Sequence, residues 1–345
     1  MNTMLRLGIA GTGAMAATYA RTIMAVPDLS LDAVLSNDAD RAAQFSAAHG
    51  ATVGTADLTA LLDRVDAVYV ATEPHRHADV VTAALMAGRP VLVEKPLSPD
   101  AATTHRLLDL SQERGVPLVE AIWTLVLPGF AALRQAVNAG HHGAPLRLAF
   151  DFSLPVDPFH ASKLFDAATG GGVLLDRAVY GVAAAHDLLG PVADQNVTLR
   201  RTAQGIETDA ILVLTHENGA QSVISLSFDA VGSNALDLAC TRANLRLGPP
   251  SLAAEALQVT PYRSAPPPTS APSLASRLKQ RPGLRRIKRT LTQIRGQSYP
   301  WGAFPYQPML AHFADVVRQG AKTSTVITPD LMRAVADIVD QARRG

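Results

Sequence analysis

The sequence predicts an α/β protein of two domains: a parallel sheet flanked by helices in residues 1–122, then an α+β unit with an open, mainly antiparallel sheet in residues 123–345. Its 345 residues exceed what one ordinary hydrophobic core supports. Short apolar runs alternate with helical stretches up to Glu120, as in βαβ units. After Trp123 the strands have a period near two and follow one another with only loops between most of them, as in an antiparallel sheet.

The expected elements follow from these patterns in chain order. First-domain strands are expected at residues 6–11, 31–36, 66–72, 90–95 and 117–121. Helices are expected at residues 14–24, 38–50, 75–88 and 98–115, the last with Ser98 as its cap and Pro99 as its first residue. The second domain should hold strands at 147–154, 208–216, 221–229 and 235–240, with helices at 171–190, 309–319 and 329–344.

Composition places the chain among globular proteins of the cytoplasm. It has 48% hydrophobic and 18% charged residues, no apolar run of membrane-spanning length, and an N-terminus without the features of a signal peptide. Cys240 is the only cysteine, so no intramolecular disulfide can form, and we expect it to fill space in the core.

The basic charge is concentrated in one proline-rich insertion, at about residues 262–300. The net charge of +1 gives no reason to expect a nucleic-acid partner, yet residues 277–295 hold eight basic side chains and no acidic one. Three interpretations stay open for this segment: a solvated loop, a weak contact with an anionic surface such as a membrane, or a contact within an oligomer.

A glycine-rich loop follows the first expected strand and precedes a helix. GTGAMA places Gly11, Gly13 and Ala16 in the spacing G-x-G-x-x-A. The first glycine permits a tight turn, the second lets a pyrophosphate approach, and the small third residue lets helix and strand pack closely. This context favours a Rossmann dinucleotide site over a simple tight turn, with the phosphates held by the loop's backbone, including that of Thr12, Ala14 and Met15.

The end of the second strand, where a cofactor ribose would lie, carries no acidic residue at Ser36 or Asn37. Asp38 follows and caps the next helix in one interpretation. Because Ser36 and Arg41 suit a 2′-phosphate and no carboxylate repels it, we favour NADP, with NAD as the alternative.

The run VLVEKPLSP ends a buried strand in Glu94, Lys95 and Pro96. Two interpretations are open: the charged residues and the proline only end the strand, or they have a function at its end. Ligands of doubly wound sheets collect at the carboxyl ends of the strands, so Lys95 would lie near the nicotinamide and stabilise charge on a substrate oxygen.

Together GTGAMA, VATEPHRHADVV, EKPLS and GGGVLLDRAVYGV resemble the glucose–fructose oxidoreductase/inositol dehydrogenase/MocA (Gfo/Idh/MocA) family. The resemblance spans nearly the whole chain except the proline-rich basic segment. EAIWT and LFDAATGGGVLLD are most similar to the branch that includes dihydrodiol dehydrogenases.

The resemblance implies a set of site residues. Lys95 would be the catalytic lysine, with Glu94 near the nicotinamide ribose and Pro96 in a cis bond. Asp176 and Tyr180, whose spacing of four puts them on one helical face, would complete the site. Tyr180 would exchange the substrate proton, its pKa lowered by Lys95. The alternative for Asp176 and Tyr180 is an exposed charge and a packing aromatic residue.

Further positions are less specific. Thr72 and His77 are expected at the cofactor, and Trp123 and Arg177 at the substrate, although Trp123 suits a core role equally. Departures from the family pattern are Ala178 in place of glycine, Glu73 after the fourth expected strand, and Asn37 where many NADP-preferring relatives carry arginine. His75, His77, His141 and His142 lack a third ligand at suitable spacing, so no metal is expected, and His160 is a guess for the cleft.

These observations favour an NAD(P)-dependent oxidoreductase that transfers a hydride between nicotinamide and a carbinol carbon of a sugar, cyclitol or dihydrodiol. We expect a homodimer or homotetramer, since relatives cover the open sheet by dimerising. The alternatives are a redox-neutral glycosidase or epimerase that retains its cofactor, and a non-catalytic dinucleotide sensor.

Overall fold

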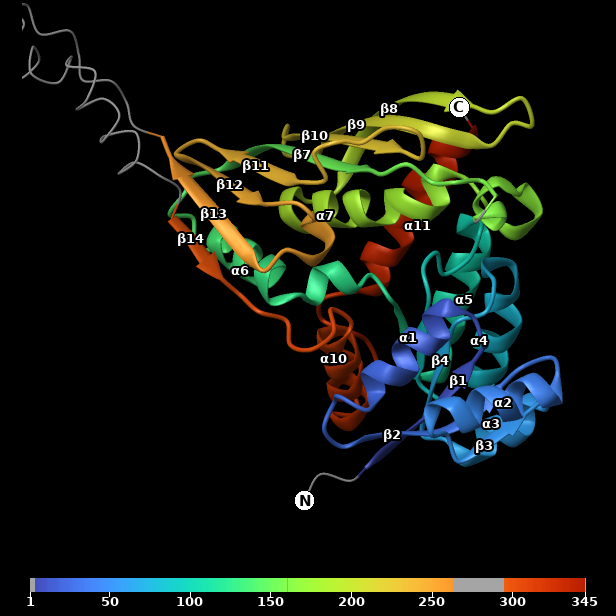
Figure 1. Cartoon of the computed structure of the whole chain (residues 1–345). Coiled ribbons are helices and arrows are strands. Elements are labelled where there is room, and N and C mark those ends of the chain that lie inside the picture. The colour runs from blue at the N-terminus through green and yellow to red at the C-terminus, as the bar shows by residue number, and fades with distance from the viewer. Residues whose placement is uncertain (1–3, 160, 263–294, 345) are drawn as a thin grey trace, which may run out of the picture.

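The computed structural model describes residues 4–159, 161–262 and 295–344, which form two stacked units (Figure 1). Most of the predicted insertion at 262–300, with nearly all of its basic cluster, lies outside the described residues, as does His160. No helix in the described part is long and apolar enough to cross a membrane.

The first domain is the predicted doubly wound parallel sheet. Its strand order is β3-β2-β1-β4-β5-β6, with every pair parallel. All five expected strands are confirmed, and the short third strand was missed because its three residues show no apolar run. The strands are β1 (Leu5–Ala10), β2 (Leu29–Leu35), β3 (Val53–Thr55), β4 (Ala67–Val70), β5 (Val91–Val93) and β6 (Leu118–Glu120).

Aspartates start three of the helices that flank this sheet. Asp38, Asp57 and Asp100 each accept a hydrogen bond from a backbone N–H in the first turn. The prediction that Ser98 caps the last helix is wrong, because Asp100 does so two residues later, while Ser98 Oγ donates to Asp100 O. The helices are α1 (Ala14–Ile23), α2 (Ala39–His49), α3 (Leu58–Arg64), α4 (His77–Met86) and α5 (Ala101–Arg114), with a 3₁₀ turn η1 (Pro74–Arg76).

The second domain has one sheet in the order β14-β13-β12-β11-β7-β10-β9-β8. It is mainly antiparallel, as expected, with β7 and β10 as its parallel pair. Four of its strands were missed from the sequence: β8, β12, β13 and β14. The bounds are β7 (Pro145–Ser153), β8 (Val192–Arg201), β9 (Glu207–His216), β10 (Gln221–Ser227), β11 (Leu236–Cys240), β12 (Ala243–Leu247), β13 (Ala256–Pro261) and β14 (Arg295–Ser298).

Helices α6 (Pro128–Asn138), α7 (Val179–Leu189) and α11 (Pro329–Arg344) lie on the face of this sheet that is turned toward the first domain (Figure 1). Helix α7 packs closely, since a Cβ at Gly181 would meet Phe150 and Ile224 at 2.7 Å. On the other face, where the described chain places no helix, Ile211 and Val213 are 49% and 37% exposed. Short 3₁₀ turns occur at η2 (Trp123–Val126), η3 (Ser162–Phe165), η4 (Ala167–Thr169) and η6 (Ser251–Ala253).

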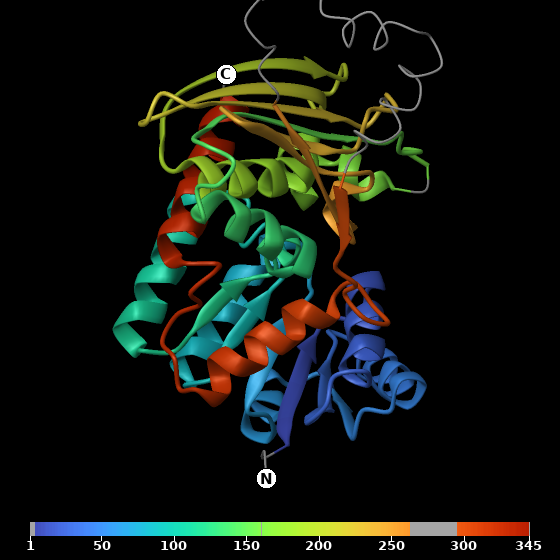
Figure 2. The same cartoon turned by 90° about the vertical axis from the view of Figure 1, so that its left-hand side faces the viewer.

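Helix α10 (Gln307–Arg318) returns to the first domain and lies beside α1 (Figures 1 and 2). Gln307 Nε2 donates to Ala25 O at 2.8 Å, and Arg318 donates to Asp28 O at 2.9 Å. The predicted domain boundary at residue 122 therefore does not account for α10. Apolar periodicity located this helix, but it contains no signal for the surface against which the helix packs.

Candidate active site

The glycine-rich loop joins β1 to α1. Gly11 has a φ of +121°, and a Cβ there would lie 2.5 Å from Ala71 O, so only glycine fits. At Gly13 a Cβ would meet nothing within 4 Å, and Gly13 starts α1 without a side-chain cap. The glycine thus keeps space open above uncapped N–H groups, with Thr12, Ala14 and Met15 completing the loop. These features fit a dinucleotide pyrophosphate.

The end of β2 is neutral or basic, as expected. Asp38 Oδ1 accepts from Arg41 N at 2.8 Å and is occupied as the α2 cap. Arg41 Nη2 donates to Asn37 Oδ1 at 2.8 Å, which places an exposed guanidinium at the start of α2. Ser36 is buried, and its Oγ accepts from Asp38 N at 3.4 Å. No carboxylate at positions 36–37 opposes a 2′-phosphate.

Lys95 and Asp176 form an ion pair that joins the two domains. Lys95 Nζ donates to Asp176 Oδ1 at 2.7 Å and to Asp176 O at 2.8 Å. Burial lowers the pKa of Lys95, but Asp176 together with Tyr180 and Glu94 outweighs burial, and the net pKa is raised. Burial raises the pKa of Asp176, but Lys95 and Arg177 together bring that pKa below its ordinary value. Both groups are charged, and the Lys95–Pro96 bond is cis, as expected.

Tyr180 lies next to this ion pair. Lys95 Nζ is 5.5 Å from the centroid of its ring, and Trp123 Nε1 donates to Tyr180 Oη at 3.2 Å. We predicted a lowered pKa for Tyr180, and this is wrong. Burial raises its pKa by more than Lys95 lowers it. Tyr180 is therefore a neutral phenol whose oxygen accepts from Trp123, leaving its own O–H to donate.

The predicted helix at 171–190 begins differently from expectation. Residues Leu174–Ala178 form a π-helical turn that leads into α7. Gly172, with a φ of +112°, precedes it, and a Cβ there would lie 2.2 Å from Glu207 Oε2. π-turns are often found at functional sites, and here the widened turn carries Asp176. The run of three glycines before the turn is the feature of the sequence that could have indicated an irregular helix start. The apolar periodicity gives no such indication.

Arg177 does not reach the pocket. Its side chain is buried between the rings of Phe152 and Phe228, with the guanidinium carbon 4.5 Å from each centroid. Nη1 donates to Leu154 O at 3.0 Å and to Ser227 O. The predicted contact with substrate has no support in this placement: the guanidinium joins the ends of β7 and β10, and its Nε lies 3.6 Å from Asp176 Oδ2, behind the pocket lining.

Three other predicted residues lie behind the site. Trp123 is 8% exposed and donates to Tyr180. It therefore belongs to the core and also contacts a residue of the candidate site. Glu94 is buried and accepts from Tyr69 Oη at 2.6 Å; burial raises its pKa. His77 is fully buried among backbone carbonyls, including Thr72 O at 3.0 Å, and does not line the pocket.

Sequence reasoning missed the aromatic residues around Glu94. Tyr19 of α1 stacks on Tyr69 with centroids 4.0 Å apart, and Tyr306 lies 5.4 Å from Tyr19 and 4.8 Å from Trp123. Burial raises the pKa of Tyr19, Tyr69 and Tyr306, so all stay neutral. Only the tertiary fold brings Tyr306 here from the segment before α10.

A pocket of about 110 Å³ opens over the Lys95–Asp176 pair. On its rim Lys163 of the second domain donates to Glu73 of the first, and this hydrogen bond lowers the pKa of Glu73. Each domain thus contributes one cation and one anion to the pocket. It is lined by Glu73, Pro74, Lys95, Pro96, Lys163, Leu164, Thr169, Gly170, Leu175 and Asp176.

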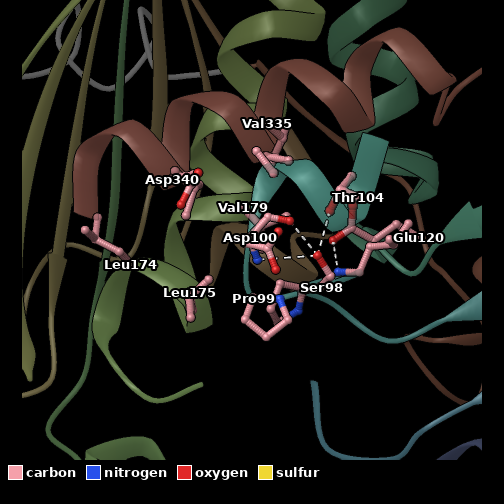
Figure 3. A pocket seen from close by; sticks show the side chains of 15 residues that line it. Ser98, Pro99, Asp100, Thr104, Glu120, Leu174, Leu175, Val179, Val335 and Asp340 are labelled. Atoms are coloured by element: carbon pink, nitrogen blue, oxygen red, sulfur yellow. Dashed lines mark hydrogen bonds between the residues drawn. The ribbon is translucent and has the colours of Figure 1, made fainter. Parts of the chain in front are cut away.

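A second cavity shares Pro96 and Leu175 with the first as lining residues. Figure 3 shows the side chains that line it. Its volume is about 30 Å³, enough for roughly one water molecule. Ser98, Thr104 and Glu120 face it, together with apolar residues of α7 and α11. Within the described residues no group of three or more His, Cys, Asp or Glu side chains is arranged to hold a metal ion.

Comparisons with known proteins agree with this geometry. Residues 5–121 match the model of an oxidoreductase family with an NAD-binding Rossmann fold, and residues 130–246 match the GFO/IDH/MocA C-terminal domain. The dTDP-3,4-didehydro-2,6-dideoxy-alpha-D-glucose 3-reductase of Streptomyces antibioticus is 32% identical over 250 residues, 70% of this chain and 75% of that protein. The trans-1,2-dihydrobenzene-1,2-diol dehydrogenase of Oryctolagus cuniculus is 27% identical, covering 98% of this chain and 97% of that protein.

Solved structures show the same architecture. A 3-ketoreductase from Actinomadura kijaniata, in complex with NADP and TDP-benzene, superposes with a TM-score of 0.78 at 25% identity. The match covers 100% of this chain and 98% of that chain. The likeness therefore extends over both domains rather than the nucleotide-binding domain alone.

Proposed function

This chain belongs to the Gfo/Idh/MocA oxidoreductase family, and from that premise we propose that it is an NADP-dependent reductase or dehydrogenase of a carbinol carbon in a deoxysugar or dihydrodiol. The observation that carries the proposal is the Lys95–Asp176 pair, held beside a neutral Tyr180 and open to a pocket at the carboxyl end of β5.

The residues have distinct roles in this proposal. The nicotinamide, when bound, supplies or accepts the hydride. Lys95 donates a hydrogen bond to the substrate oxygen and stabilises the negative charge that develops on it during reduction. Tyr180 gives its proton to that oxygen as the carbonyl becomes a hydroxyl, and takes the proton back in the reverse direction. Asp176 keeps Lys95 charged and directed into the pocket.

The cofactor preference rests on the end of β2. Arg41 is exposed at the start of α2 and Asn37 is neutral, so a 2′-phosphate meets a cation and no carboxylate. Asp38 is the nearest carboxylate, and its role as the α2 cap fixes it on the helix N–H. Replacing Arg41 with alanine should weaken NADPH binding more than NADH binding.

The test is a turnover assay at 340 nm with purified protein. 3-Keto deoxysugar nucleotides are offered with NADPH, and trans-dihydrodiols with NADP. We expect turnover with a member of one class, lost in Lys95→Ala and reduced in Tyr180→Phe. Dinucleotide binding without turnover on either class would reject these two substrate classes and leave the family assignment in place.

We also propose that the exposed sheet face joins two copies of the chain. Ile211 and Val213 on β9 are partly exposed apolar residues on the face of the second-domain sheet that carries no helix in the described chain. Light scattering should give a dimer or tetramer mass, and Ile211→Lys with Val213→Lys should shift it toward the monomer.

A further inference from the structure

The backbone that carries Lys95 leaves the parallel sheet where the hydrogen-bond ladder ends. Strand β5 has only three residues. Glu94 N donates to Val70 O at 2.9 Å, and Ala121 N donates to Val93 O at 2.8 Å. The next residues, 95–97, which we call the Lys95 turn, are buried or half-buried beyond these bonds. Their backbone polar groups need other partners, because unpaired buried groups are costly.

Glu120 supplies the partner on one side. It is the last residue of β6 and pairs with Val93 in the sheet register. Its side chain is 3% exposed, and its Oε1 accepts from Leu97 N at 2.9 Å. Figure 3 shows it beside Ser98 and Thr104 in the second cavity. A buried carboxylate thus replaces the strand that would otherwise bind this N–H.

His77 supplies the partner on the other side. The ring is fully buried at the start of α4. Its Nδ1 lies 3.0 Å from Pro96 O and 3.3 Å from Leu97 O, and its Nε2 lies 3.0 Å from Thr72 O. Burial lowers the pKa of His77, so the ring is neutral and carries a single N–H. With that proton on Nδ1, the tautomer assigned here, His77 donates to Pro96 O of the Lys95 turn, while Nε2 only lies against the loop after β4.

We propose that His77 and Glu120 are positioning residues for Lys95: they hold the Lys95 turn from both sides so that Nζ meets Asp176 of the other domain. Neither side chain lines the pocket over Lys95. They act through backbone groups at Pro96 and Leu97. The proposal depends on the proposed function only in that Lys95 is the residue worth positioning.

The geometry makes Lys95 sensitive to this support. Its ammonium group makes two short bonds to Asp176, and a displacement of the turn by about 1 Å is enough to break such contacts. A lysine that stays paired and protonated reacts slowly with acylating reagents, whereas a released lysine is a better nucleophile. The reactivity of Lys95 therefore reports its positioning, whatever the substrate is.

The experiment measures acetylation of Lys95 by an N-hydroxysuccinimide ester, by mass spectrometry, relative to the exposed Lys322 in the same molecule. In Glu120→Ala and His77→Phe we expect the Lys95 to Lys322 ratio to rise about fivefold or more, because a backbone partner is lost. In Glu120→Gln the ratio should stay within about twofold, because the amide oxygen still accepts from Leu97 N.

Thr104→Val is the matched control. Thr104 is 2% exposed and faces the same cavity, but its side-chain hydrogen bond, at 3.0 Å, is with Ser98 Oγ rather than with a group of residues 95–97. Its ratio should equal that of the wild type. In Glu120→Ala and His77→Phe, turnover at saturating NADPH should fall about tenfold while the NADPH Kd stays within about threefold.

Wild-type labelling in both Glu120→Ala and His77→Phe, with cooperative melting and normal NADPH binding, would overturn the proposal. If Glu120→Ala does not fold, Glu120→Asp replaces it, since its carboxylate is one methylene too short for Leu97 N, and an unchanged ratio there would also overturn the proposal. A wild type that binds no dinucleotide would instead reject the proposed function, and the labelling would still decide the role of His77 and Glu120.

Discussion

Residues 11–16 and residues 95–97 both follow the carboxyl ends of parallel strands, yet they are held in different ways. The glycine loop depends on what is absent: Gly13 leaves open space and Gly11 avoids Ala71 O. In our proposal the Lys95 turn depends on the buried side chains of His77 and Glu120, which come from other elements, and its lysine pairs with the half-buried Asp176. The first arrangement can be read from a short local pattern, whereas the second exists only once the chain has folded.

The largest effect should come from removing the ammonium group. Lys95→Ala should lower kcat by about a thousandfold, since one donor to a developing oxyanion contributes about 10²–10³ and Asp176 would keep only its ion pair with Arg177. The NADPH Kd should change little, because the phosphate loop is untouched. Steady-state kinetics and fluorescence titration on the same preparation measure both. A tenfold weaker NADPH binding in this variant would show that the two ends of the site are not independent.

The free energy of unfolding should depend on pH because Glu120 is buried. Its pKa is raised from 4.5 to about 7: burial raises it most and Glu94 adds to this, while the Leu97 N–H and Lys95 oppose the rise. Because the folded-state pKa is raised, the stabilisation belongs to the protonated form: it is present in full below about pH 4.5 and lost as the pH rises through about 7.

Glu120→Gln should remove this dependence. The free energy of unfolding of the wild type relative to this variant should fall by roughly 3 kcal/mol or less between those pH values. Urea unfolding at several pH values measures it. Parallel curves for the two proteins would contradict the assignment.

Gly13→Ala should weaken NADPH binding without lowering the stability of the fold. No protein atom lies within 4 Å of the added Cβ, so the melting temperature should stay within about 2 °C, while the NADPH Kd should rise about tenfold. Gly11→Ala is the matched variant, and it should destabilise the fold by about 1–3 kcal/mol because of its positive φ and contact with Ala71 O. Equal melting temperatures for the two variants would contradict this distinction.

The smallest effect is expected at the rim of the pocket. Glu73→Gln removes an exposed ion pair with Lys163, and such pairs contribute at most about 1 kcal/mol. The KM of a neutral substrate should change by about threefold or less, with kcat preserved, and the difference should shrink at high salt. A large fall in kcat would show instead that this pair closes the site.

The sequence was sufficient for the doubly wound sheet, the glycine loop and the cis Lys95–Pro96 bond, because these depend on local patterns or on motifs. It also placed Lys95, Asp176 and Tyr180 together through the family resemblance. The sequence-based prediction is without support for a charged residue whose burial could not be foreseen. Arg177 looked like a substrate-facing cation and is instead enclosed by Phe152 and Phe228.

The supporting residues could not have been found in the same way. Glu120 ends an apolar strand and His77 starts a helix, so each looks like an ordinary element boundary. Their roles depend on strand β5 lying between them, which is a property of the strand order. Tyr306 and the π-turn at Leu174–Ala178 likewise depend on packing between segments far apart in sequence.

The central claim is that this fold binds a dinucleotide, with NADP preferred, next to Lys95. The most direct test is a fluorescence titration of the purified protein, first stripped of any bound nucleotide, with NADPH and then NADH. We predict saturable binding of both, with NADPH the tighter. Tighter NADH binding would contradict the role given to Arg41 and Asn37, and no binding of either would contradict the account as a whole.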